Sequence, residues 1–92
     1  MMTKLFKEEI NKLDKLLTKR NISHEKTMFT AGANIWIPKF GDYEFRIYCT
    51  EQSRGYSQGL LEVNGAGRGV LLEPTGYLHA EEAMELMEVI VA

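Results

Sequence analysis

The sequence lacks the features that mark secreted or membrane proteins. It contains one cysteine, which excludes an internal disulfide and fits a reducing compartment. Its uncharged apolar runs are a few residues long, whereas a bilayer crossing needs about 20. The basic segment followed by an apolar core that is typical of a signal peptide is also missing. We therefore expect a cytoplasmic protein without a membrane partner.

A general excess of basic residues is also missing, since the formal net charge is -2. Residues 1–26 contain seven Lys or Arg against four Asp or Glu, and residues 27–92 contain four against nine. The basic first segment is therefore expected to lie beside the acidic last segment, within one chain or between two copies. Little positive charge remains for a phosphate backbone, so a nucleic-acid partner is disfavoured.

The length and composition are those of one small folded domain. The chain has 92 residues, 45% of them hydrophobic and 26% charged. A domain of this size buries about 60 to 65% of the surface of its unfolded chain, which allows one core. We expect a single domain over residues 1–92.

Two segments have clear periodicity. Apolar residues recur every three and four positions after Thr3, which predicts a helix to about Arg20 with Asn21 as a left-handed end. Residues 43–50 alternate between apolar and polar side chains, the period of a half-buried strand. We interpret this strand as the centre of a sheet. The apolar positions of the first helix are Leu5, Phe6, Ile10, Leu13, Leu16 and Leu17.

The rest of the chain completes an α+β pattern. Residues 33–37 and 43–50 flank turn residues and are predicted to form an antiparallel hairpin, with Gly32 breaking the chain before it. Short strands are predicted at 60–63 and 70–73, around a glycine-rich turn. Pro74 and Gly76 should end the sheet, and a helix should start after His79. We predict the order α-β-β-β-β-α, an antiparallel sheet of three to four short strands, and both helices on one sheet face.

The sheet face without helices is the strongest candidate for function. Alternation directs Trp36, Arg46 and Tyr48 away from the predicted core, and the polar loop that contains Arg54 and Tyr56 follows the central strand. Aromatic residues and Arg are enriched at protein interfaces. The composition favours a protein partner or self-association as a homodimer. Burial of Trp36 under a loop is the alternative.

A second hypothesis is a small nucleic-acid-binding protein that uses the basic first helix. Acidic residues interrupt this helix, so a solvated charged face explains it equally well. Its candidate phosphate contacts are Lys12, Lys15, Lys19 and Arg20.

A third hypothesis is a hydrolase with Ser57 as the nucleophile. Residues 55–59, GYSQG, match the G-x-S-x-G pattern, which works where a strand delivers the serine to a turn and a helix follows. Here the next residues, LLEV, have the composition of a strand. The potential metal ligands His24, Cys49 and His79 are isolated from one another in sequence. We predict no enzyme activity, no metal and no cofactor.

Two segments resemble a known group of proteins. Residues 53–62, SRGYSQGLLE, and 76–83, GYLHAEEA, are similar to small uncharacterised proteins encoded by phages and prophages. Those proteins tend to have Thr or Ser where this chain has His79, which leaves the cap of the last helix in question. The resemblance implies an accessory protein of a mobile element in the cytoplasm of a bacterial host. It transfers no catalytic residue.

Overall fold

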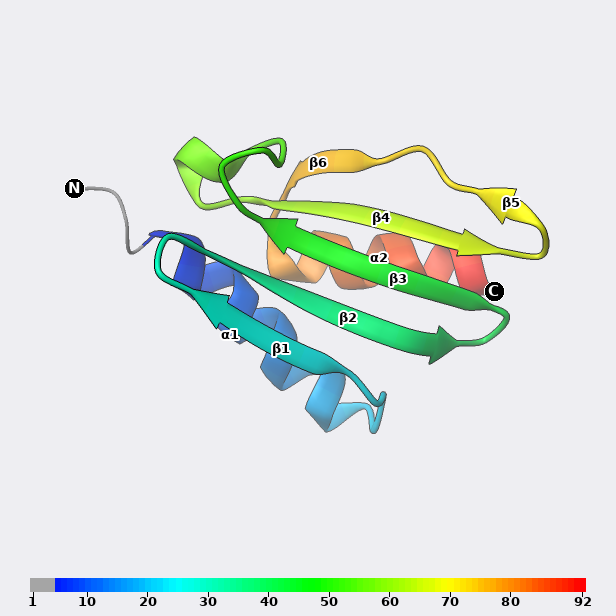
Figure 1. The fold of residues 1–92 in the computed structure, drawn as a ribbon. Coiled ribbons are helices and arrows are strands. Elements are labelled where there is room, and N and C mark those ends of the chain that lie inside the picture. Colours follow the sequence, from blue (N-terminus) through cyan, green and yellow to red (C-terminus); the bar gives the residue numbers. More distant parts are fainter. Residues whose placement is uncertain (1–4) are drawn as a thin grey trace.

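The computed structural model describes residues 5–92, which form two helices on one side of an antiparallel sheet (Figure 1). This confirms the predicted α+β class. The described elements are α1 (Leu5–Lys19), β1 (Glu25–Phe29), β2 (Gly32–Phe40), β3 (Tyr43–Cys49), the short 3-10 helix η1 (Tyr56–Gln58), β4 (Leu61–Gly67), β5 (Val70–Leu71), β6 (Thr75–Leu78) and α2 (Ala80–Val91).

The strand at 43–49, β3, lies at the centre of the sheet as predicted. The strand order is β1-β2-β3-β4-β5, and β6 also pairs with β4. The hairpin between β2 and β3 is antiparallel and places Ile35 opposite Ile47 and Trp36 opposite Arg46. Because alternate residues face opposite sides, one side of both strands is committed to the core and the other is not.

The predicted number of strands was too low, because the described residues form six. Residues 25–29 form β1, which pairs with β2 through a turn at Thr30 and Ala31. This turn has no Asn-Gly or Asp-Gly signature. Gly32 does not break a strand but begins β2. A Cβ atom at this glycine would lie 3.1 Å from the carbonyl oxygen of Cys49, so the absence of a side chain allows close packing against the end of β3.

The end of the sheet also differs from the prediction. β4 continues through the glycines to residue 67, and the turn consists of Arg68 and Gly69, both with positive φ. Pro74 and Gly76 do not end the sheet, since β6 pairs with the outer side of β4. Pro74 is tolerated beside this edge strand because no further strand needs a backbone N–H donor from it. Inside β4, residue 65 is a glycine for a steric reason: a Cβ atom there would lie 2.7 Å from the Phe45 ring.

The core lies between the sheet and the two helices. The predicted stripe of α1 is largely confirmed, although Leu5 is exposed and Leu16 is half-buried. The predicted start at Thr3 lies outside the described residues, and Asn21 has the predicted left-handed conformation. In α2, Ala80 and Met84 are buried and Leu86 and Ile90 only partly so. The fully or almost fully buried side chains are Phe6, Ile10, Leu13, Leu17, Ala33, Ile35, Ile37, Phe45, Ile47, Cys49, Leu61, Val63, Ala80, Ala83, Met84 and Met87.

A carboxylate from α1 holds the start of α2. Glu9 is buried, and its Oε1 accepts the backbone N–H of Ala80 at 2.7 Å. The His79 ring lies beside the same carboxylate, and the backbone N–H of His79 is bonded to Glu82. Burial disfavours the charged form of Glu9, but the Ala80 N–H, His79 and Lys12 outweigh it and lower its pKa. A negative charge at this position also suits the positive end of the α2 dipole.

Candidate protein-interaction face

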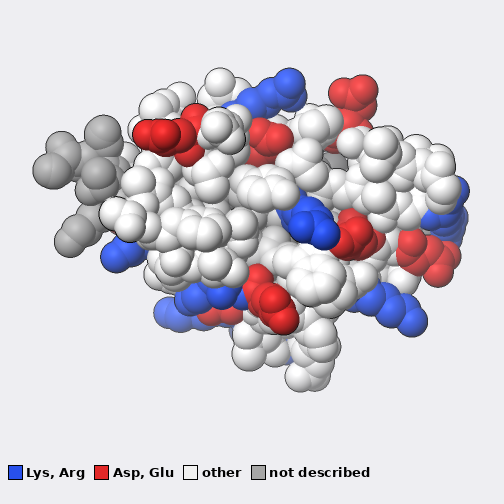
Figure 2. Space-filling view, viewed as in Figure 1, with Lys and Arg blue, Asp and Glu red and all other residues white. Residues whose placement is uncertain are grey.

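The side of the sheet opposite the helices is not covered by any described element (Figure 1). We call it the open face. Figure 2 shows it as a largely uncharged surface with few charged side chains near its middle. By strand register, its members are Glu25, Thr27 and Phe29 of β1, Asn34 and Trp36 of β2, Glu44, Arg46 and Tyr48 of β3, Glu62, Asn64 and Ala66 of β4, and Leu71 of β5.

The centre of the open face is a cluster of Trp36, Arg46 and Glu44. The Arg46 guanidinium lies over the indole ring, with its Cζ 5.6 Å from the ring centroid. Glu44 Oε2 accepts the indole N–H of Trp36 at 2.6 Å and an N–H of Arg46 at 2.9 Å. The pKa of Glu44 is lowered, first by the bond from Trp36 and then by the bond from Arg46. The three side chains therefore hold one another in a fixed orientation while remaining partly accessible to solvent.

A second set of hydrogen bonds attaches the loop after β3 to the open face. Glu62 Oε1 accepts the backbone N–H of Arg54 at 2.7 Å, and its Oε2 accepts the side-chain amide of Asn64 at 3.1 Å. Tyr48 pairs with Glu62 across the strands. The Arg54 guanidinium turns toward β6 and donates to the carbonyl of Pro74 at 3.4 Å. Glu62 thus connects Tyr48 and Arg54 through strand pairing and one hydrogen bond.

Two hollows open on this face, one lined in part by Arg46 and the other in part by Tyr48. The first has a volume of about 420 Å³, and its lining combines polar side chains of β3 and β4 with the apolar residues Leu71, Leu72 and Pro74. The second has a volume of about 370 Å³ and is mostly polar. Asn64 belongs to both. A surface with aromatic and Arg side chains beside hollows can accept protruding side chains of a partner.

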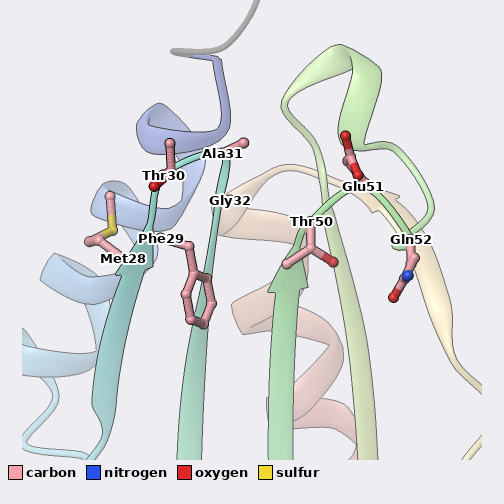
Figure 3. Close-up of a pocket in the computed structure, with 8 residues that line it drawn as sticks. All are labelled: Met28, Phe29, Thr30, Ala31, Gly32, Thr50, Glu51 and Gln52. Atoms are coloured by element: carbon pink, nitrogen blue, oxygen red, sulfur yellow. The ribbon is translucent and has the colours of Figure 1, made fainter.

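A third hollow, of about 650 Å³, lies at one end of the sheet between the β1–β2 turn and the residues after β3. Figure 3 shows the Phe29 ring lying across β2 near Gly32, with Thr50 beyond it. Phe29 is 50% exposed. The sequence does not predict Phe29 as part of the sheet, because the strand is predicted only at residues 33–37, after Gly32. The alternation of Thr27 and Phe29 was the available signal.

The structure brings together three of the five predicted interface residues and places the other two differently. Trp36, Arg46 and Tyr48 share the open face, and Trp36 is half-buried by its neighbours. Arg54 borders this face at β6. Tyr56 packs against the core, and its hydroxyl donates to the carbonyl of Ala31 at 2.6 Å. Its side chain therefore fixes the loop to the β1–β2 turn.

The four basic residues of the nucleic-acid hypothesis are distributed along α1. Lys12 lies 3.5 Å from Glu9, and Arg20 forms an ion pair with Glu88 of α2. The latter pair agrees with the expected contact between the basic first segment and the acidic last one. Lys15 and Lys19 are exposed. Half of the proposed phosphate contacts thus already have a carboxylate partner.

Ser57 lies in η1, a single turn between two left-handed glycines, Gly55 and Gly59. The element that follows is a strand, β4, as its sequence indicates. The geometry therefore lacks the helix that would follow a nucleophile elbow. Burial raises the pKa of Cys49 to about 11, with Glu9 adding to the effect, so its thiol is poorly reactive near neutral pH.

Comparison of the chain with protein-family models, curated proteins and solved structures returned no match. Within residues 5–92, neither α1 nor α2 combines the length and apolar character needed to span a membrane. The same residues contain no group of three or more His, Cys, Asp or Glu side chains placed to hold a metal ion.

Proposed function

We propose that this protein is a non-enzymatic accessory protein of a phage or prophage that binds another protein through the open face of its sheet. The observation that carries the proposal is the Trp36–Arg46–Glu44 cluster, fixed by two hydrogen bonds and a cation–π contact on a face that neither α1 nor α2 covers. The mobile-element context and the bacterial cytoplasm rest on the resemblance of residues 53–62 and 76–83.

The energetics of the cluster support binding. Arg46 and Glu44 neutralise each other before a partner arrives, so the partner does not have to bring a charge to match either one. The indole ring and the Tyr48 ring offer large apolar contact areas with few rotatable bonds, which lowers the entropy lost on association. The two hollows beside these rings are concave, and the anchoring side chains of a partner usually pack into such pockets at interfaces.

The test is capture of partners from host-cell extract by tagged protein, with and without nuclease. The Trp36→Ser/Tyr48→Ser variant should lose the captured protein, while a Lys15→Ser/Val89→Ser control on the helix side should keep it. Val89 is 69% exposed, so this control should fold. A partner that the open-face variant still captures would overturn the proposal. Capture that disappears with nuclease and with Lys15→Ser would favour nucleic-acid binding by α1.

A further inference from the structure

The two edges of the sheet differ in how well they are protected. On one side, β4 is covered by two short strands, β5 and β6, with Pro74 between them and a register shift in the β4–β6 pairing. Short strands, proline and irregular register are devices that prevent further strand pairing. On the other side, β1 is a regular five-residue strand with β2 as its neighbour on one side. All five of its residues are exposed.

The lysine of β1 is turned away from its edge. Lysine commonly protects an edge strand. Lys26, however, donates to Asn11 Oδ1 at 3.0 Å and lies 3.2 Å from Asp14 Oδ2, so its side chain is turned toward α1. The two apolar residues at the end of the strand, Met28 and Phe29, are 40% and 50% exposed. The edge therefore offers unpaired backbone groups together with apolar side chains.

We propose that β1 pairs antiparallel with β1 of a second copy, so that two molecules share one continuous sheet. A two-fold axis at Thr27 sets this residue opposite its own copy, Lys26 opposite Met28, and Glu25 opposite Phe29. This register uses all five residues and brings no like charges directly opposite each other. Moving the axis to Lys26 would place two ammonium groups face to face, and moving it to Met28 would shorten the paired segment.

The choice of a second copy rests on this self-complementarity. Both charged residues of β1 meet uncharged residues, and each copy covers the exposed Met28 and Phe29 of the other. The two open faces become one surface, because the row through Arg46, Trp36 and Glu25 continues to Phe29 of the second copy. The pairing uses the edge and does not depend on what the open face binds.

Cross-linking tests the register directly. Cys49 is buried, so wild-type protein should resist a short bismaleimide. Thr27→Cys should give a cross-linked dimer in nearly full yield. Glu25→Cys is the matched control on the same strand and face. In this register the introduced thiols of the two copies would lie roughly 14 Å apart, so this variant should stay uncross-linked. The Glu25→Cys/Phe29→Cys double variant should cross-link again.

Sedimentation gives the second readout. Wild-type protein should sediment as a dimer, and Thr27→Lys should be monomeric with an unchanged circular dichroism spectrum. A folded Thr27→Cys variant that stays monomeric, equal cross-linking of Glu25→Cys, or a monomeric wild type would each overturn the proposal. A monomer that instead pairs β1 with a strand of another protein would also overturn it. Cross-linking that fails while the open face still captures its partner would leave the proposed function intact.

Discussion

On the helix side of β3, Phe45, Ile47 and Cys49 are fully buried, whereas on the open side of the same strand Arg46 is exposed and Tyr48 half-buried. The first set belongs to the hydrophobic core, which includes apolar side chains of both helices. On the open side, Arg46 is held by a hydrogen bond to Glu44 and a cation–π contact with Trp36. One strand therefore supplies the core with one set of residues and the candidate binding surface with the other. Substitutions on the two sides should have separable effects on folding and binding.

Neighbouring residues of β3 give the largest contrast. Ile47→Ala should lower the free energy of unfolding by about 2 to 5 kcal/mol, because it leaves a cavity in the core. Arg46→Ala should lower it by about 1 kcal/mol or less, since an exposed ion pair and cation–π contact are weak. Urea unfolding monitored by circular dichroism measures both. Similar losses for the two variants would show that the open face belongs to the core.

The Glu9 contact tests how the helix side is held together. Glu9→Gln should cost about 1 to 3 kcal/mol, because the buried charge-assisted bond to the Ala80 N–H is weakened. Glu8→Gln, one residue away and exposed, should change stability by about 0.5 kcal/mol or less. The same urea titration compares the two. If Glu9→Gln lowers the free energy of unfolding no more than Glu8→Gln does, the Glu9 carboxylate does not stabilise the start of α2.

Acid should weaken the helix side through Glu9 and Asp14. Burial opposes ionisation of Asp14, but hydrogen bonds from His24 and Lys26 outweigh it, so its pKa is lowered, as is that of Glu9. A lowered folded-state pKa means that the unfolded chain binds protons more readily. The stabilisation is therefore present above the ordinary carboxyl pKa values and is lost as the pH falls from these through the lowered folded-state values.

The measurement is the urea midpoint as a function of pH. Wild-type protein should lose stability over this range, and Asp14→Asn and Glu9→Gln should each flatten the curve. A variant curve parallel to that of wild type would show that the substituted carboxyl does not contribute to the acid sensitivity.

The parts of the fold that the sequence predicts are those with local signals. The stripe of α1, the left-handed Asn21 and the alternation along β3 depend on residues close together in the chain, as does the grouping of Trp36 with Arg46. β1 was missed because its turn, Thr30 and Ala31, carries no turn signature.

Other features depend on contacts between distant segments. β6 was missed because Pro74 and Gly76 usually end strands, yet here Pro74 precedes β6 and Gly76 lies within it, in the strand that pairs with β4. Glu9 has the sequence context of a solvated helix residue, and its burial depends on Ala80, 71 positions later. The packing of half-buried Tyr56 against the core likewise depends on the carbonyl of Ala31. No local pattern contains these long-range partners.

The most direct test of the division between folding and binding is the unfolding free energy of Trp36→Ser/Tyr48→Ser. We expect a cooperative urea transition that loses about 2 kcal/mol or less, because both side chains are only half-buried and lie outside the core. A loss as large as that of Ile47→Ala, or a transition without cooperativity, would show that these aromatic side chains hold the fold together, and would contradict their assignment to a binding surface.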